Sequence, residues 1–499
     1  MPEHIRALVV ILLIAAVTFA ISKKAFIPTV SNEQFSRWRN AWFVVTLVAF
    51  LSHNFWIYIF ASGLVIAFIS RSESNKIALF FALLFAAPSV SSGIAGFAGI
   101  NYFFEINHFR LLSLTLLLPA FISLVSSSTT LRFGKNLPDK FIALYLILII
   151  ALEIRGTTAT DSLRQAMYSF TDVFLPYYVI SRSLKQLDHL KNALIAFVTA
   201  AGVIAAIAGF EFLKGWLLYS SLPNIWDTSD GMGNYLRRDS YLRALASLGH
   251  PIVLGYVLVV AIGFYLFTKQ FIRSKTIQRL GLMLLAGGLI ATLSRGPWVG
   301  AGILVILFIL TGPQAFKRLA MLSMGLVIVI PLISVMPGGD KVINLLPFVG
   351  NVEKGNIDYR EKLLENSIAV IGRNPLFGSV DYLRAPEMQE MVQGEGIIDI
   401  VNTYIQIGLR HGLVGLGLFV GIFLAILFGI YRCRKNIPDK TSELHLLGRS
   451  LIATLGAVLV IIFTVSSIGA IPLVYWSLAG IGVAYIGIVK GTLNSQKSV

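Results

Sequence analysis

Long apolar segments recur through most of this chain, and they constrain its fold more than any other feature. Runs of about 16 to 22 apolar residues match the hydrocarbon thickness of a bilayer. The sequence is 56% hydrophobic and only 13% charged, about half the charged fraction of an ordinary soluble protein. Helices satisfy their own backbone groups in lipid, so the pattern predicts an all-α polytopic membrane protein.

The apolar runs predict about 15 transmembrane helices, with about 13 as the lower bound. The expected spans are 7–22, 40–53, 54–70, 77–95, 110–126, 141–154, 167–181, 191–213, 251–267, 279–293, 297–312, 319–336, 412–431, 447–467 and 471–489. Residues 40–70 could instead form one bent segment, and Pro88 interrupts 77–95. Lys23 and Lys24 follow the first apolar run, which favours an uncleaved span with its N-terminus outside.

The net charge of +16 is explained by short basic loops between the expected spans, as the positive-inside rule requires. A nucleic-acid partner is therefore not expected. The loops assigned to the inside are 23–39, 71–76, 132–140, 182–191, 269–279, 317–318 and 432–449. This alternation places 214–250, the turn at 294–297 and the segment 337–411 on one outer face. Cys433 is the only cysteine, so no intramolecular disulfide can form.

The polar segment 337–411 is the longest interruption of the apolar pattern, and we expect it to be folded and functional. It divides the chain into a bundle at 1–336 with a smaller outer loop at 214–250, a large periplasmic loop at 337–411, and C-terminal helices at 412–499. A helix is expected from Arg360 onward. Its apolar residues recur at helical spacing, which predicts an amphipathic helix with one face lying on the membrane or on the bundle. They are Leu363, Leu364, Ile368 and Ile371.

Two arginines are candidates for binding an anion. Arg295 begins an expected helix with Gly296 and Pro297, where free backbone amides favour negative charge. Arginine also binds phosphate bidentately. The alternative for Arg295 is a lipid-headgroup anchor. Arg360 has the alternative of an ordinary salt bridge to Glu361 or Asp358.

Further charged residues flank these arginines along the chain. Arg237, Arg238 and Arg243 form a basic cluster that could attract an anionic lipid or substrate, or form a solvated loop. His250 precedes Pro251, a position more typical of helix entry than of a base.

Two carboxylates are the candidates for a general base. Asp399 and Glu395 lie in the long segment, where a carboxylate near the bilayer can have a raised pKa. A turn or cap role is equally compatible with either residue.

The order of three short motifs resembles the O-antigen ligase and polymerase superfamily of bacterial envelope enzymes. The first motif comprises residues 245–255 and the later run Thr292-Leu293-Ser294-Arg295-Gly296. The second extends from Tyr359-Arg360 to Asn374-Pro375-Leu376-Phe377-Gly378. The third extends from Asn402-Thr403-Tyr404 to Gly412-Leu413-Val414-Gly415. The resemblance implies a metal-independent glycosyltransferase without a cofactor, acting on a glycan carried by undecaprenyl diphosphate. It also implies that Arg295 and Arg360 hold the diphosphate.

One departure from the family pattern bears on the reaction. The ligases carry His-Asn, nine further residues and Gly-x-x-Gly, whereas this chain has Val401 before Asn402. The nearest ionisable substitutes are Asp399, Glu395 and His411. Asp399 is the favoured base, and the arrangement favours the polymerase branch.

The sequence thus predicts an O-antigen or exopolysaccharide polymerase in the bacterial inner membrane, with its site facing the periplasm. Arg237, Arg238, Arg243, His250, Glu395, Asn402, Tyr404 and His411 are the expected substrate-binding residues. The expected partners are the lipid-linked oligosaccharide, membrane lipids and a chain-length regulator.

Two other functions remain open. A ligase acting on lipid A core or protein would take its base from His250 or His411. A glycolipid flippase would need buried charges, for which Glu153 and Glu211 are the nearest candidates.

Overall fold

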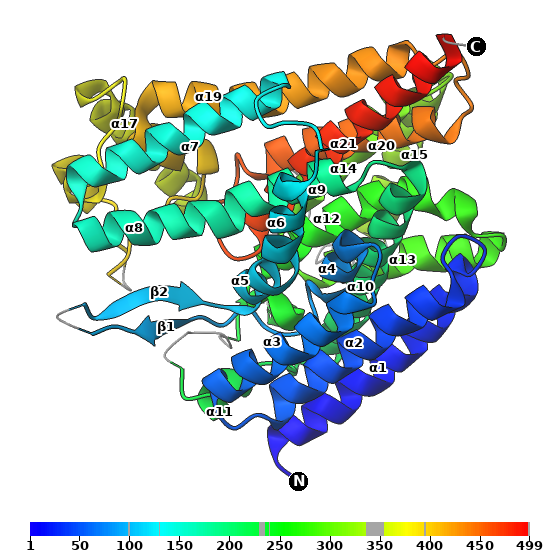
Figure 1. The fold of residues 1–499 in the computed structure, drawn as a ribbon, viewed down its shortest axis with the longest axis horizontal. Coiled ribbons are helices and arrows are strands. Elements are labelled where there is room, and N and C mark those ends of the chain that lie inside the picture. The colour runs from blue at the N-terminus through cyan, green and yellow to red at the C-terminus, as the bar shows by residue number, and fades with distance from the viewer. Residues whose placement is uncertain are drawn as a thin grey trace.

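The computed structural model describes residues 1–97, 100–128, 130–228, 235–238, 240–335, 354–393 and 396–497. In chain order (Figure 1) its first half contains α1 (Glu3–Phe26), α2 (Asn32–Leu51), α3 (Phe55–Arg71), α4 (Lys76–Leu83), β1 (Ser92–Ala95), β2 (Tyr102–Ile106), α5 (His108–Leu112), α6 (Leu118–Ser126), α7 (Leu137–Gly156), α8 (Ala159–Tyr168), α9 (Leu175–Ser183), α10 (Leu187–Lys214) and α11 (Leu222–Ile225). Its second half contains β3 (Arg237–Arg238), β4 (Tyr241–Leu242), α12 (Pro251–Thr268), α13 (Lys275–Ala291), α14 (Arg295–Leu310), α15 (Ala315–Val335), α17 (Lys354–Arg373), α18 (Pro386–Gln389), α19 (Thr403–Lys435), α20 (Glu443–Ile461) and α21 (Ile471–Lys497).

Helices make up nearly all of the fold, which confirms an all-α membrane protein. Among the described residues, 7 helices are long and apolar enough to cross a membrane, and two shorter apolar helices accompany them. The seven are 3–26, 108–126, 187–214, 251–271, 403–435, 443–461 and 471–495, and the two are Phe55–Arg71 and Arg295–Leu310. The larger number of spans expected from the sequence stays a prediction.

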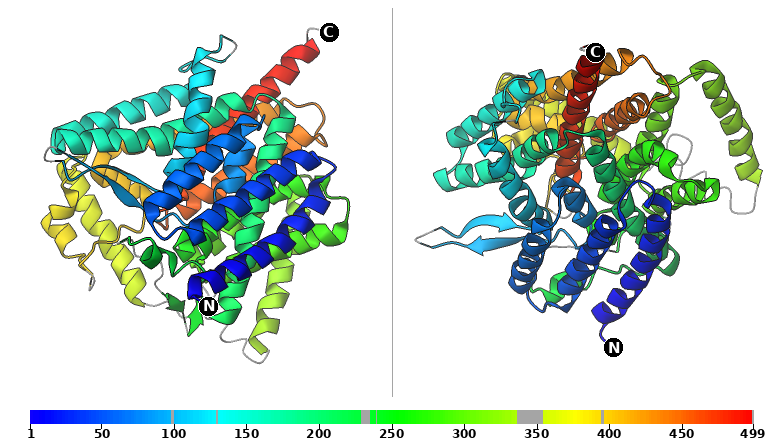
Figure 2. Two further views of the ribbon diagram at one scale, coloured as in Figure 1. Left: turned by 60° about the horizontal axis from the view of Figure 1, so that its bottom comes forward. Right: turned by 45° about the vertical axis from the view of Figure 1, so that its right-hand side comes forward.

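The interior of the bundle is formed by α10, α12 and α21, whose side chains are buried nearly all round. A helix that is apolar on every side can achieve this only in the core of a large bundle. One continuous cluster of buried residues joins these helices to α1, α2, α4 and α20. The helix α15 contacts the margin of the bundle and stands apart from it in Figure 2.

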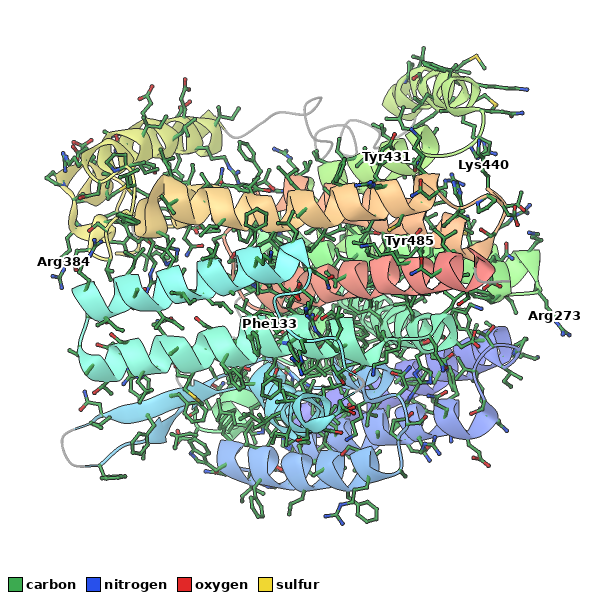
Figure 3. The ribbon with its side chains drawn as sticks, turned by 45° about the horizontal axis from the view of Figure 1, so that its top comes forward. Phe133, Arg273, Arg384, Tyr431, Lys440 and Tyr485 are labelled. Carbon is green, nitrogen blue, oxygen red and sulfur yellow. The ribbon has the colours of Figure 1, made fainter. Side chains whose placement is uncertain are left out.

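The two ends of the bundle differ in character (Figure 3). Arg384, in the segment after α17, lies at one end, whereas Arg273 and Lys440 lie at the other. We call the first the loop end. It carries the strands β1 and β2, the connection from α10 to α12, the turn at 292–294, helices α17 and α18, and the connection at 462–470.

The described part of the long polar segment is folded, as the sequence predicts. Its buried side chains form a small core of their own, which includes Leu409 of α19. On α17 the buried face contains Leu363, Ser367 and Val370, with Ile371 partly buried. Leu364 and Ile368 are exposed, so contact of these two residues with a membrane stays a prediction.

One other expectation differs from the structure. The apolar run 77–95 is not one helix, because α4 ends at Leu83 and a strand begins at Ser92, on either side of Pro88. Proline lacks a backbone donor and disfavours continuation of a helix. Residues 40–70 form two helices, α2 and α3, as the two expected spans predict, so the alternative of one bent segment does not hold.

Candidate active site

The connection between α20 and α21, residues 462–470, gathers three distant parts of the chain at the loop end. Thr403 donates its backbone N–H to the carbonyl oxygens of Ile462 and Val465, each at 3.0 Å. Arg360 donates from Nη2 to the carbonyl oxygen of Thr464 at 3.3 Å. The starts of α17 and α19 therefore meet on this connection.

The start of α14 meets the same connection at Gly296. A Cβ atom at this position would lie 2.5 Å from Thr464 Oγ1, so only glycine permits the contact. Arg295, the first residue of α14, is half-buried beside it. Thr464 is thus contacted by Arg360 through its carbonyl oxygen and by Gly296, the neighbour of Arg295, through its hydroxyl, although 65 positions separate residues 295 and 360 in the sequence.

The connection at 462–470 differs from the sequence-based expectation, in which residues 462–467 belong to the span 447–467. The available signal was a group of small and polar residues inside an apolar run, formed by Thr464, Ser466, Ser467 and Gly469. Such groups mark helix ends and close backbone approach.

The turn at 292–294 is held in place by two of the predicted substrate-binding arginines. Arg243 donates to the carbonyl oxygen of Thr292 at 3.3 Å and to Ser294 Oγ at 3.0 Å. Arg238 donates to the carbonyl oxygen of Leu293 at 2.6 Å. Both arginines therefore support the start of α14.

Arg237 lies on the strand β3 and is exposed, with its guanidinium bonded to the carbonyl oxygen of Ser240 at 3.1 Å. It remains the one arginine of this basic cluster that extends over the surface.

Arg360 and Asp399 form the electrostatic centre of the site. Both keep access to solvent, yet each is partly desolvated by the surrounding chain. Burial lowers the pKa of Arg360, and the nearby charge of Asp399 raises it. Burial raises the pKa of Asp399, and the charge of Arg360 lowers it. The Tyr359 hydroxyl donates to the Asp399 carbonyl oxygen at 2.9 Å and holds this backbone in place.

The described residues provide no carboxylate within salt-bridge distance of Arg360. Its expected partners Glu361 and Asp358 make no ion pair with it in this part of the structure. The guanidinium is bound through one backbone carbonyl, so its charge is not neutralised. Such a charge is suited to an anionic ligand.

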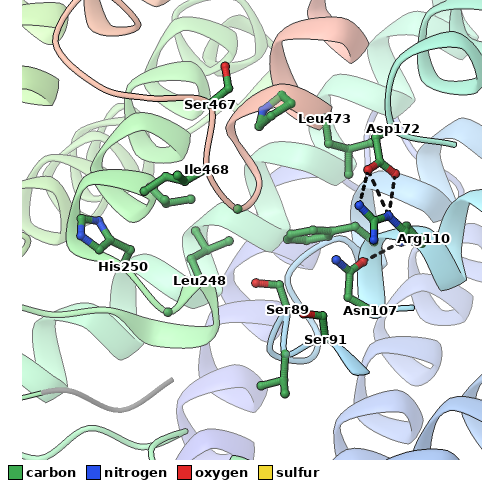
Figure 4. A pocket seen from close by; sticks show the side chains of 16 residues that line it. Ser89, Ser91, Asn107, Arg110, Asp172, Leu248, His250, Ser467, Ile468 and Leu473 are labelled. Atoms are coloured by element: carbon green, nitrogen blue, oxygen red, sulfur yellow. Dashed lines mark hydrogen bonds and ion pairs between the residues drawn. The ribbon is translucent and has the colours of Figure 1, made fainter. Parts of the chain in front are cut away.

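His250 lies in a cavity of about 480 Å³ that also opens at the loop end (Figure 4). The cavity is lined by Ser89, Ser91, Asn107, Arg110, Asp172, Leu248, Gly249, His250, Ser467, Ile468, Gly469 and Leu473, among others. Its polar wall is the ion pair between Arg110 and Asp172, with the closest atoms at 2.9 Å. The connection at 462–470 forms another wall.

The chemistry of His250 is set by its place at the start of α12. Its Nδ1 accepts the backbone N–H of Ile252 at 3.2 Å, so this nitrogen caps the helix. Burial, and then the charge of Arg243, lower the pKa of His250 to about 4. The ring is therefore neutral at pH 7 with its proton on Nε2, and it offers a donor to the cavity. The helix-entry interpretation is confirmed.

The remaining predicted residues are distributed around the start of α19. Asn402 Oδ1 accepts the backbone N–H groups of Tyr404 and Ile405 at 2.9 and 3.2 Å and so caps the helix. The Tyr404 hydroxyl donates to the Leu459 carbonyl oxygen at 2.9 Å. Val401 packs against the small core of the long segment. Glu395 lies outside the described residues.

Two of the three sequence motifs contact each other where α19 is interrupted. Gly412 has φ 68° and ψ −173°, a conformation essentially restricted to glycine. The N–H groups that the interruption releases are bound by the other motif, with Leu413 donating to Pro375 at 2.8 Å and Val414 to Leu376 at 3.2 Å. This contact fixes the long segment to α19.

Among the residues that the structure describes, no group of three or more His, Cys, Asp or Glu side chains is placed to hold a metal ion.

Residues 280–420 match the family model Wzy_C, described as O-antigen ligase. This range contains Arg295, Arg360 and Asp399, and it ends before the connection at 462–470. No curated protein sequence matches the chain.

Proposed function

We propose that this chain is a polysaccharide polymerase, and the match of residues 280–420 to the O-antigen ligase family model supports the proposal. It transfers a growing glycan from undecaprenyl diphosphate to a second lipid-linked repeat unit. The reaction takes place at the outer face of the bacterial inner membrane and uses no metal or cofactor.

The observation that carries the proposal is that Arg360 and the start of α14 both contact Thr464. Arg295 and Arg360 are the groups that would bind the diphosphate. Charge gathers on the diphosphate as the glycosidic bond breaks, so fixed cations stabilise the transition state more than the ground state. Removing one such group typically costs about 100-fold to 1000-fold in rate.

Asp399 is the proposed general base. Its carboxylate takes the proton of the acceptor hydroxyl, and the acceptor oxygen forms a bond to the anomeric carbon. The bond from that carbon to the diphosphate oxygen breaks, and its electron pair leaves with the diphosphate. Burial raises the pKa of Asp399, which makes it a stronger base than an exposed aspartate, whereas Arg360 keeps it ionised.

The ligase reaction is the second candidate, and its base would be a histidine. His250 is a weak candidate, because its Nδ1 is bound by a backbone N–H and its Nε2 holds the proton. His411 remains for that role. Val401 contacts apolar side chains in place of the family histidine, which supports the polymerase over the ligase.

A flippase would need charged groups that change partners during transport. Glu211 instead accepts the backbone N–H groups of Leu218, Leu245 and Ala246 at 2.9 to 3.0 Å. Glu153 is paired with Arg410 at 2.6 Å. Both carboxylates hold fixed structure, which favours an enzyme.

Turnover of a lipid-linked repeat unit by the purified protein tests the proposal. Wild type is expected to produce a ladder of longer glycans, which Arg295→Ala, Arg360→Ala and Asp399→Asn each reduce by about 100-fold or more. Arg384→Ala is the matched control, since this side chain is 84% exposed and distant from Thr464 in sequence. Transfer of one glycan to lipid A core or protein, without a ladder, would establish the ligase instead.

The proposed sidedness has a separate test, which the single cysteine makes simple. In a Cys433→Ser background, Arg384→Cys and Lys440→Cys each place one thiol at opposite ends of the bundle (Figure 3). A membrane-impermeant maleimide should label position 384 in intact spheroplasts and position 440 only after lysis. The reverse pattern would place the loop end in the cytoplasm.

A further inference from the structure

A second cavity, of about 190 Å³, lies among α7, α8, α19 and α21, which are neighbours in Figure 1. Its wall combines apolar surface with a group of polar side chains, which includes Glu153, Gln165, Gln406, Arg410, His411 and Tyr475. Ser467, from the connection at 462–470, lines both this cavity and the larger one. The two cavities therefore adjoin at the connection that gathers the candidate active site.

The ion pair in this wall leaves one carboxylate oxygen unused. Arg410 donates from Nε and Nη2 to the same atom, Glu153 Oε1, at 2.7 and 2.6 Å. Glu153 Oε2 is buried and has no hydrogen-bond partner among the described residues. The Glu153 side chain is 5% exposed and that of Arg410 is 31% exposed. The pair thus extends inward from the surface, with the unused oxygen at its deep end.

His411 adds a second unused atom to the same wall. Its Nδ1 is buried without a hydrogen-bond partner in the described part of the chain. The ring is held edge-on against Tyr145, with centroids 6.3 Å apart. A buried polar atom without a partner costs about 1–3 kcal/mol, so both atoms are suited to a ligand that brings hydrogen-bond donors.

The chemistry of the wall narrows the class of ligand. An anion would be repelled by Glu153 Oε2, and a cation would lie beside Arg410. The volume corresponds to about six water molecules, which is below the usual size of a cavity for a drug-sized ligand. A single ring with several hydroxyl groups fits both the size and the demand for donors.

We infer that this cavity is a subsite for one sugar ring of the lipid-linked glycan. Glu153 Oε2 accepts a sugar hydroxyl, and His411 Nδ1 and Gln165 complete the polar surroundings. The inference rests on the proposed function and adds a place where the glycan itself is recognised. Glu153 and Gln165 are then specificity residues, separate from the arginines proposed to bind diphosphate.

Two lipids separate sugar recognition from diphosphate recognition. The first is undecaprenyl diphosphate, and the second is the undecaprenyl-diphosphate-linked repeat unit extracted from cells that lack this protein. Native mass spectrometry of the full-length protein in nanodiscs gives both affinities. Wild type should bind the sugar-bearing lipid at least about tenfold more tightly, as a charge-assisted hydrogen bond requires.

Glu153→Gln and Gln165→Leu should each bring the ratio of the two affinities toward one. The affinity for undecaprenyl diphosphate itself should not change. Gln165→Leu breaks no ion pair, so it tests the sugar subsite even if Glu153→Gln does not fold. Leu163→Gln, an exposed change on the same helix, is the control. If a folded Glu153→Gln or Gln165→Leu protein still prefers the sugar-bearing lipid, the subsite is overturned and the proposed function is not. A wild-type protein that binds neither lipid would overturn the proposed function as well.

Discussion

Two of the arginine–carboxylate pairs near the loop end differ in how far the arginine is neutralised. Arg410 and Glu153 are in direct contact, with two donors on one oxygen and a carboxylate that is almost completely buried. Arg360 and Asp399 influence each other's titration without a salt bridge between them in the described structure.

This difference in neutralisation indicates a structural role for the Arg410–Glu153 pair and a ligand-binding role for the Arg360–Asp399 pair. A buried, contacting pair is costly to break, because either partner alone would be a charge without compensation. The first pair therefore fixes α7 against α19. The second pair keeps a cation available for an anionic ligand and a carboxylate available for a proton.

The change with the largest expected effect removes the contact that positions both pairs. Gly412→Val places a side chain where Cβ would lie 2.3 Å from the Leu376 carbonyl oxygen, in a backbone conformation that only glycine adopts. We expect a loss of more than about 4 kcal/mol, seen as loss of folded protein by fluorescence-detected size exclusion.

Gly417→Val is the matched control for this change, since open space surrounds that glycine on the same helix. Normal recovery of Gly412→Val would show that the two motifs need not contact each other at this interruption.

Breaking the buried pair should cost about 3 kcal/mol, which is the lower end of the range because Arg410 reaches solvent. Glu153→Ala is therefore expected to lower the melting temperature in detergent. Glu153→Leu combined with Arg410→Leu should recover much of it, since an apolar pair leaves no unpaired charge. The exposed pair of Arg384 and Asp381 provides the comparison, and Asp381→Ala should have almost no effect. If Glu153→Ala and Asp381→Ala lowered the melting temperature equally, the buried pair would be no more important to stability than the exposed pair.

A smaller effect is expected when the available cation is kept but its shape is changed. Arg360→Lys retains the charge and loses the planar donor fork, so transfer should slow by about tenfold. The steady-state rate with the lipid-linked repeat unit measures this. A Lys variant as inactive as Arg360→Ala would mean that the geometry, rather than the charge, is essential.

The smallest effect is a shift in pH dependence. Asp399 must be ionised to act as a base, so activity falls as the pH drops through its pKa. Arg360 lowers that pKa, and Arg360→Gln should therefore move the acid limb of the residual activity to higher pH. If the acid limb of the pH profile does not move in Arg360→Gln, Asp399 is not the general base.

The sequence predicted the membrane bundle and the folded polar segment because both depend on local patterns of apolar residues. It also predicted that the turn at 294–297 and the long segment would share one end, and Arg360 and Gly296 do meet at Thr464. The alternation of loop charge carries this information from one end of the chain to the other.

Three features could not be predicted, because they depend on tertiary contacts. Thr464 lies in an apolar run, so its role as a meeting point has little local signal. Arg238 and Arg243 support a turn about 50 positions away, which spacing alone does not reveal. The pairing of Arg410 with Glu153 joins two helices that are far apart in the sequence.

The connection at 462–470 also determines when the site comes into existence. The chain is synthesised from its N-terminus, so Arg295 is made first, Arg360 and Asp399 follow, and Thr464 is made after all three. A nascent protein that lacks α20 and α21 has both arginines but lacks the connection that Arg360 and the start of α14 contact. Completion of the site therefore coincides with insertion of α20 and α21, and a protein truncated before residue 462 should be inert toward the proposed lipid substrate.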